Sequence, residues 1–234
     1  MRSKRNSGQI YGLPVMKFTL TYDGPLPSSG SHPKNQAKWD IRKKLHPQLK
    51  DLSDNHPALL GVKAHNVFPK YGGAVLLQYH HDHPGPLIPP WAPNTSRPDV
   101  KQEWIDLCEP IEKHGKTFIP LVRNSFFLHC GLKIVFLRRE EPGRVYQGGD
   151  IDGRLKTLLD GLAMPQHKEQ IIDDKDAPEP LYCLMEDDAL ISGINVESER
   201  LLSDDNLPKD YAKLTIEVDV RVRQAMIYNQ SFLG

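Results

Sequence analysis

The sequence predicts an α+β fold, in which a mixed or antiparallel sheet is packed by an N-terminal helix and a central helix. Residues 15–22, 181–202 and 211–225 alternate apolar and polar side chains, as half-buried strands do. These strands surround two helical patterns without the regular strand–helix–strand repeat of a parallel α/β protein. At 234 residues, the chain can bury one large core. We therefore expect a single domain over residues 1–234, with a long irregular insertion at about 55–116.

Two stretches have the apolar spacing of amphipathic helices. In residues 37–52 apolar positions recur at near-helical intervals, and the remaining positions are rich in lysine and arginine. Pro47 is expected to kink this helix or to split it in two. In residues 152–162 four leucines fall at i, i+3, i+4 and i+7, which is the stripe of a helix packed against a sheet. These leucines are Leu155, Leu158, Leu159 and Leu162.

The segment between these helices contains weaker signals. Residues 99–111 have the pattern of a short capped helix within the insertion. Two apolar runs follow at residues 117–122 and 126–137, joined by three polar residues. This arrangement predicts a β-hairpin in the interior of the sheet.

Charge is unevenly distributed along the chain, although 30 Lys and Arg balance 30 Asp and Glu. Residues 1–50 contain ten Lys or Arg and two Asp or Glu, whereas residues 168–210 contain four and thirteen. A basic region attracts the phosphates of nucleic acids. The alternative is that the basic and acidic regions neutralise each other in the folded chain. The sequence leaves both interpretations open.

Targeting and membrane segments are missing from the sequence. The N-terminus has no apolar signal segment, and no stretch approaches the roughly 20 apolar residues of a membrane helix. The three cysteines, Cys108, Cys130 and Cys183, are far apart and form no Cys-x-x-Cys pair, which favours buried thiols in a reducing compartment. We expect a cytoplasmic protein that does not bind membranes.

The strongest chemical signal is the pair Asp150 and Asp152, immediately before the central helix. Carboxylates at a helix start interact favourably with free backbone N–H groups and with the positive end of the dipole. One aspartate suffices for such a cap. Asp152, Lys156 and Asp160 also recur every four residues, which is the spacing of an ordinary surface ion-pair ladder. The other interpretation is a divalent cation between the two carboxylates, because crowding them costs electrostatic energy otherwise.

A second acidic pair, Asp187 and Asp188, interrupts the alternating stretch at 181–202. Aspartate is unfavourable inside strands. The pair either marks a turn between two shorter strands, or one member faces Asp150 and Asp152 and completes a site. Three or four converging carboxylates suit Mg²⁺, which prefers oxygen ligands and often acts in phosphoryl transfer, and Mn²⁺ could take its place.

The segments GDIDGRLKTLLDGL (149–162) and MEDDALI (185–191) resemble the signature of the RusA-type Holliday junction resolvases. That signature is D-x-D-N, a lysine four residues after the second aspartate, an Asp-x-Leu, and a later D-D before an apolar strand. The resemblance covers residues 15–50 and 126–222, about half of the chain. Gly153 stands where the family usually has asparagine.

The resemblance implies an α+β homodimer that cuts branched DNA symmetrically with Mg²⁺. It implies that Asp150, Asp152, Lys156 and Asp188 are catalytic. Among these, the three aspartates would bind the metal, with Asp187 as a further ligand, and Lys156 would be the functional lysine.

Basic residues beside the motif and on the N-terminal helix are candidate contacts to DNA, although each could equally be a solvated surface charge. They are Arg138, Arg139, Arg144, Arg154, Lys38, Lys43 and Lys44.

Two other functions fit parts of the sequence. A DxD nucleotide-sugar transferase holds its metal with a similar carboxylate pair, but that motif ends a strand in a larger domain of βαβ units, which is not predicted here. A catalytically degenerate RusA-like module that binds DNA or protein would account for Gly153 and the insertion. The sequence favours a Mg²⁺-dependent endodeoxyribonuclease that hydrolyses phosphodiesters in branched DNA, in recombination or repair.

Overall fold

The computed structural model describes residues 16–28, 34–64, 67–69, 104–106, 109–139, 151–202, 206–208, 210–224, 229 and 232, and these form the predicted α+β fold. The helices are α1 (Lys34–Asn55), α2 (Pro57–Ala64) and α4 (Ile151–Leu162), with 3₁₀ turns η1 (Lys168–Gln170) and η2 (Asp188–Leu190). The strands are β1 (Lys17–Pro25), β2 (Val67–Pro69), β3 (Trp104–Asp106), β4 (Ile111–Lys113), β5 (Lys116–Val122), β6 (Leu128–Arg138), β7 (Leu181–Met185), β8 (Ile191–Arg200) and β9 (Tyr211–Val222).

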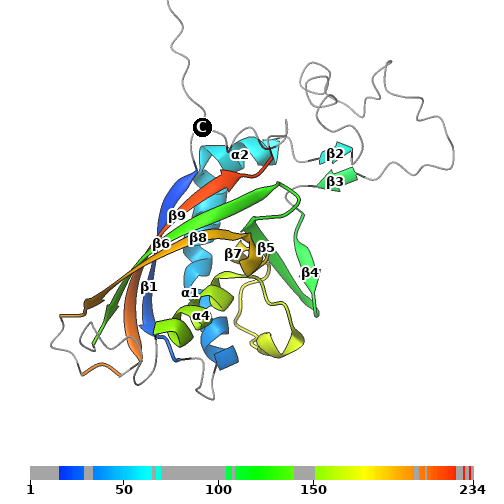
Figure 1. Ribbon diagram of the computed structural model, residues 1–234. Coiled ribbons are helices and arrows are strands. Elements are labelled where there is room, and N and C mark those ends of the chain that lie inside the picture. The colour runs from blue at the N-terminus through cyan, green and yellow to red at the C-terminus, as the bar shows by residue number, and fades with distance from the viewer. Residues whose placement is uncertain are drawn as a thin grey trace, which may run out of the picture.

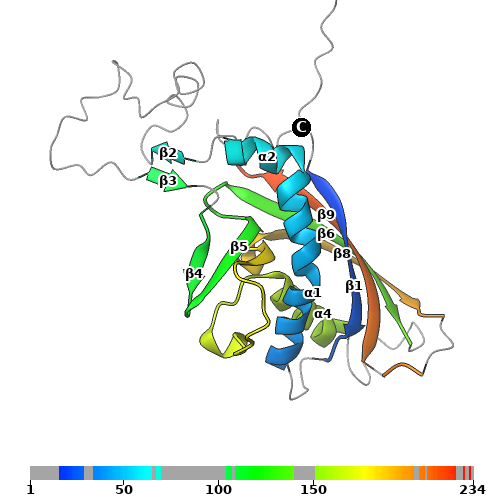
Figure 2. The same cartoon turned by 180° about the vertical axis from the view of Figure 1, so that it is seen from behind.

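Two mixed sheets organise these elements. The main sheet has the order β1-β9-β6-β8, in which β6 and β8 are parallel and the other pairs are antiparallel. The second sheet has the order β4-β5-β7, in which β5 and β7 are parallel. Strands β2 and β3 form a separate antiparallel pair. The two opposite views place α1 and α4 on the same side of the main sheet, next to β7 (Figure 1, Figure 2).

The core lies between the main sheet and these two helices. Alternation along β6 turns one set of side chains, from Leu128 to Phe136, inward, and all are at most 3% exposed. The stripe of α1 meets them with Ile41, Leu45 and Leu49, each at most 1% exposed. Burial of each such side chain stabilises the fold by about 1.5–3 kcal/mol. None of the helices that the structure describes is long and apolar enough to cross a membrane.

Helix α1 continues through Pro47, so the predicted split at this residue is wrong. Proline lacks an N–H group, and its position leaves the Lys43 carbonyl without its usual helical donor. Because Pro47 is exposed, the Lys43 carbonyl one turn earlier on the same side of α1 can accept a hydrogen bond from water instead. The helix ends only at Asn55, and α2 begins at Pro57, where a proline fits the first turn of a new helix.

The predicted β-hairpin is also wrong, because its two strands belong to different sheets. Strand β5 pairs with β4 and β7, whereas β6 pairs with β8 and β9. The alternating stretch at 181–202 divides in the same way, into β7 in the second sheet and β8 in the main sheet. The helix predicted over residues 99–111 is wrong where the chain is described, since β3 occupies residues 104–106 and β4 begins at Ile111.

The two turns that separate these strands are bonded to each other. The Glu186 amide donates to the Val122 carbonyl at 2.9 Å, and the Asn124 amide donates to the Glu186 carboxylate at 2.9 Å. The junction between the sheets therefore lies at the segment that carries Asp187 and Asp188. The interpretation of this acidic pair as a turn between two shorter strands is confirmed.

The close approach of α1 and α4 generates a stability prediction. A Cβ atom at Gly161 would lie 2.8 Å from Cγ2 of Ile41, which is closer than packed carbon atoms tolerate. We expect Gly161→Ala to lower the free energy of unfolding by about 1–3 kcal/mol, measured by urea denaturation. Gly193→Ala is the control, because a Cβ there meets nothing within 4 Å. Equal stability of the two variants would contradict this packing.

A second prediction concerns His46, which ties α1 to the free edge of β7. Its Nδ1 accepts a hydrogen bond from the Tyr182 amide at 3.1 Å. Burial, with a smaller contribution from Lys50, lowers the pKa of His46. The stabilising contribution is therefore complete above the unfolded-state pKa of about 6.5 and is lost as pH falls through the lower folded-state value.

We expect the free energy of unfolding to decrease between about pH 7.5 and about pH 5. The decrease should be smaller in His46→Gln, whose amide oxygen can accept the same hydrogen bond without titrating. His56 and His129 also have lowered pKa values but stay in both proteins, so the comparison isolates His46. An identical pH dependence in the two proteins would show that His46 contributes nothing to it.

Candidate active site

Helix α4 presents a line of charged side chains along one edge. Asp152 lies in its first turn and is exposed, in the position that the helix dipole favours for a carboxylate. Lys156 follows one turn later and is also exposed, whereas Asp160 is half-buried. Asp150 immediately precedes the helix and lies outside the described residues. Asp152 and Lys156 are thus open to solvent, whereas Asp160 is partly covered.

Arg42 of α1 anchors the C-terminal end of α4. Its guanidinium is 1% exposed, and it donates from Nε to the Ala163 carbonyl at 2.8 Å and from Nη2 to the Asp160 carbonyl at 2.6 Å. These carbonyls have no donor within the helix and lie at its negative end. Burial lowers the pKa of Arg42 to about 10, so the group is still charged at neutral pH.

The acidic turn is fixed by its own backbone and side-chain contacts. Asp187 accepts a hydrogen bond from the Ala189 amide at 2.8 Å and caps η2. Gln166 donates from its amide group to the Glu186 carbonyl at 2.7 Å. The turn η2 packs against α4. The second acidic pair therefore adjoins the helix that carries Asp152.

Asp188 of the acidic turn is coupled electrostatically to Asp160, in the C-terminal half of α4. Burial raises the pKa of Asp188, and the neighbouring Asp187 and then the charge of Asp160 raise it further. Burial and neighbouring negative charge both disfavour the charged form of a carboxyl group. Hard oxygen ligands of this kind suit Mg²⁺ or Mn²⁺. The donor chemistry of this region therefore fits the expected ion.

The described residues supply only part of the expected ligand set. Asp152, Asp187 and Asp188 belong to them, and Asp150 does not. Within the part of the chain that the structure describes, no three His, Cys, Asp or Glu side chains are grouped closely enough to hold a metal ion. The structure thus brings Asp188 to α4 and couples it to Asp160, a residue to which the sequence assigned no role in the site.

Two of the predicted DNA contacts are buried. Arg138 is 2% exposed and Arg154 is 4% exposed, so neither guanidinium faces solvent as a phosphate contact requires. Arg138 lies two residues after Phe136 on β6, so its side chain points to the same, inward face of the sheet. Arg154 lies one turn before the buried Leu158 on the packed side of α4. For these two residues we correct the expectation of a solvent-facing role.

The remaining predicted contacts are mostly engaged within the protein. Lys38 pairs with Asp160 at 2.6 Å and Lys43 with Asp174 at 2.7 Å. Lys44 donates to the Asp23 carbonyl. The Lys43–Asp174 pair joins the basic and acidic regions of the sequence, as the neutralisation interpretation expects.

Arg139 is the exposed arginine of the predicted contact set within the described residues, and it donates to the Leu207 carbonyl. Arg144 lies outside these residues.

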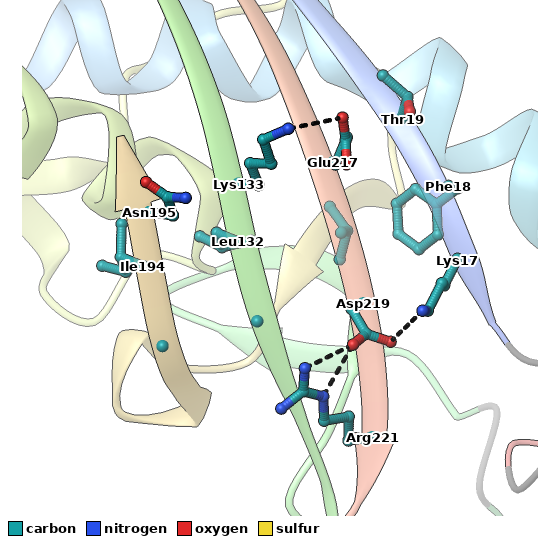
Figure 3. Close-up of a pocket in the computed structure, with 13 residues that line it drawn as sticks. Lys17, Phe18, Thr19, Leu132, Lys133, Ile194, Asn195, Glu217, Asp219 and Arg221 are labelled. Carbon is teal, nitrogen blue, oxygen red and sulfur yellow. Dashed lines mark hydrogen bonds and ion pairs between the residues drawn. The ribbon is translucent and has the colours of Figure 1, made fainter. Parts of the chain in front are cut away.

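A separate cavity of about 610 Å³ lies on the opposite face of the main sheet. Gly131 and Gly193 leave space there, and the charged side chains around it pair with one another (Figure 3). Lys133 meets Glu217 at 3.8 Å, and Arg221 meets Asp219 at 2.7 Å. No predicted site residue lines this cavity. It therefore does not belong to the candidate active site.

Sequence reasoning missed Arg42, although a signal was present. Arg42 is three residues before Leu45 and seven before Leu49, so it occupies a position of the apolar stripe of α1. A charged residue at a stripe position indicates a buried polar partner. The carbonyls at the end of α4 are that partner.

Comparisons of the chain with protein-family models, with curated proteins and with solved structures find no match.

The Arg42 anchor generates a third prediction. Arg42→Met should lower the free energy of unfolding by about 2–4 kcal/mol, because one buried and one partly buried carbonyl lose their donors. Arg221→Met is the matched control: Arg221 also bonds to an acceptor, Asp219, but is exposed, so its loss should cost less than about 1 kcal/mol. Chemical denaturation of both variants measures the difference. Similar losses would rule out the anchoring role of Arg42.

Proposed function

We propose that the protein is a Mg²⁺-dependent, structure-specific endodeoxyribonuclease that hydrolyses phosphodiesters in branched DNA such as Holliday junctions. One observation carries this proposal: the turn with Asp187 and Asp188 packs against α4, on which Asp152 and Lys156 are exposed. A hydrolytic site for phosphodiesters needs carboxylates for a cation and a fixed positive charge near the phosphate. The resemblance of this motif to the RusA-type resolvases supports the same conclusion.

The residues have separate tasks in the proposed reaction. Asp150, Asp152 and Asp188 would hold the divalent cation, with Asp187 fixing the turn. The bound cation would polarise the phosphoryl group and increase the acidity of the attacking water. Lys156 would stabilise negative charge that develops on the phosphoryl oxygens. Attack of the water on phosphorus would break the bond to the 3′ oxygen, which leaves and takes up a proton, so the products would have 5′-phosphate and 3′-hydroxyl ends.

Symmetric cutting of a four-way junction requires two sites. A homodimer with a two-fold axis supplies two identical sites in opposite orientations. The proposal therefore includes a dimer as the active form, which a mass measurement in solution tests. Branched DNA is the proposed partner, and exposed Arg139 beside the motif is a candidate phosphate contact.

A DNA-binding module without activity is the second candidate, because Gly153 replaces the usual asparagine of the resembling motif. Gly153 is buried in the first turn of α4, and its carbonyl accepts a hydrogen bond from the Thr157 hydroxyl at 3.0 Å. No side-chain amide is then present at this position to act near the cation or the DNA. Binding of a four-way junction without cleavage would support this candidate over the nuclease.

The fourth prediction tests the activity directly. The wild type should cut four-way junctions in preference to linear duplex when Mg²⁺ or Mn²⁺ is present, as gel electrophoresis of end-labelled DNA measures. Asp152→Asn and Asp188→Asn should each reduce the rate by at least about 100-fold, the scale of losing one charge-stabilising group. Lys156→Met should lower kcat more than it changes KM, because its charge acts on the transition state.

Asp51→Asn is the control for the loss of one carboxylate. Asp51 is an exposed residue near the end of α1, where it accepts a hydrogen bond from Asn55 at 2.7 Å. Its removal should leave cleavage unchanged. Junction binding with no cleavage by the wild type, with either metal and on every substrate, would overturn the nuclease proposal.

A further inference from the structure

Lys38 brings a positive charge from α1 into the acidic region beside α4. Its Nζ lies 2.6 Å from Oδ2 of Asp160. The two side chains are only 11% and 19% exposed, so solvent screens this pair less than an ordinary surface ion pair. The chain just after Asp160 is joined to the strand before the acidic turn, because the Met164 amide donates to the Met185 carbonyl at 2.9 Å, and the acidic turn packs against the same helix. One ammonium group is therefore fixed among the carboxylates of the candidate site.

The position of Lys38 is set by the rest of α1. Arg42 lies one helical turn later and holds the carbonyl of the same Asp160. Ile41 packs against the neighbouring Gly161. Three residues of α1 thus meet α4 at the same place. Lys38 pairs with the Asp160 carboxylate, Arg42 bonds to the Asp160 carbonyl, and Ile41 packs against Gly161. Because α1 is already fixed, Lys38 loses little further conformational entropy when it pairs with Asp160.

We propose that Lys38 is a positioning residue that serves as the built-in counter-ion of Asp160 and prevents this carboxylate from binding a second divalent cation. This inference rests on the proposed function, because it assigns the composition of the same metal site. Catalytic sites for phosphodiester hydrolysis often contain two divalent ions, and each needs carboxylate ligands. Here the carboxylate that could serve a second ion beside Asp188 already has a cation.

The consequence is a site that takes one divalent ion per chain, with Lys38 supplying the second positive charge. The lysine belongs to the chain itself, whereas a divalent ion must be bound from solution. Removal of the lysine should leave Asp160 and Asp188 as neighbouring carboxylates without compensation. Such a pair attracts a divalent cation because binding it relieves their repulsion.

Mn²⁺ binding to the full-length chain tests the inference without any need for cleavage. Free Mn²⁺ is measured by electron paramagnetic resonance during titration, which gives the number of ions bound per chain. We expect one ion for the wild type, one for Lys38→Arg, which keeps the charge, and one additional ion for Lys38→Met. The double variant Lys38→Met/Asp160→Asn should return to one ion, because the released carboxylate is gone.

Lys43→Met is the matched control, since it removes one lysine from the same helix. Lys43 pairs with Asp174 at 2.7 Å, and Asp174 belongs to the loop between η1 and β7 rather than to the acidic turn. This variant should bind as many ions as the wild type. An equal gain in Lys38→Met and Lys43→Met would mean that overall charge sets the number of ions, and it would overturn the inference.

If circular dichroism shows that Lys38→Met does not fold, the single variant Asp160→Asn still tests the inference. It should bind one ion with unchanged affinity, because Asp160 is not a ligand while Lys38 holds it. Loss of this ion would overturn the inference, as would two ions in the wild type or an unchanged number in folded Lys38→Met. No Mn²⁺ binding by the wild type would overturn the proposed function and this inference with it, whereas one ion in every variant would overturn the inference alone.

Discussion

The hydrogen bonds from Arg42 to the end of α4 are the constraint on which the candidate site depends. A buried guanidinium is costly to desolvate, and it is retained where it satisfies groups that have no other donor. Here it satisfies two carbonyls of α4 from inside the interface with α1. Gly161 allows the helices to approach closely enough for these bonds to form. This contact region, together with the packing of Leu158 and Leu162 in the core, fixes the orientation of α4 and with it the direction of Asp152 and Lys156.

The acidic turn gains its position from a different constraint, the junction of two sheets. Strands β7 and β8 are consecutive in the chain but pair with β5 and β6 in separate sheets. The chain must therefore change sheets within a few residues, which produces a tight turn with polar side chains. The hydrogen bonds of Glu186 join this turn to the corresponding turn after β5. Asp188 is thus held by two sheets at once, and such a scaffold suits a residue that must keep its position.

Local sequence patterns predicted the helices and strands of this fold better than they predicted which strands pair with one another. The leucine stripe of α4 and the alternation of β9 were sufficient to predict both elements, because periodicity reports which side of an element is buried. Periodicity does not report which strand lies beside another, and so the hairpin of β5 and β6 was predicted wrongly. The sequence left two interpretations of Asp187 and Asp188 open, and the structure shows the turn between two strands. The Lys38–Asp160 pair and the anchor through Arg42 depend on how α1 crosses α4, which no local pattern encodes.

The ion pairs of the α1 lysines limit which parts of the protein could attract DNA. A basic N-terminal region suggested a phosphate-binding helix, yet Lys38 and Lys43 are paired with carboxylates at 2.6 and 2.7 Å. A lysine that already neutralises a carboxylate must break that pair before it can bind a phosphate, and so it adds little to the affinity for DNA. On the proposed function, exposed Lys156 and Arg139 would therefore contribute more to the attraction of the substrate than these two lysines. Helix α4 then combines buried contacts that fix its orientation with exposed side chains, Asp152 and Lys156, that are available for chemistry.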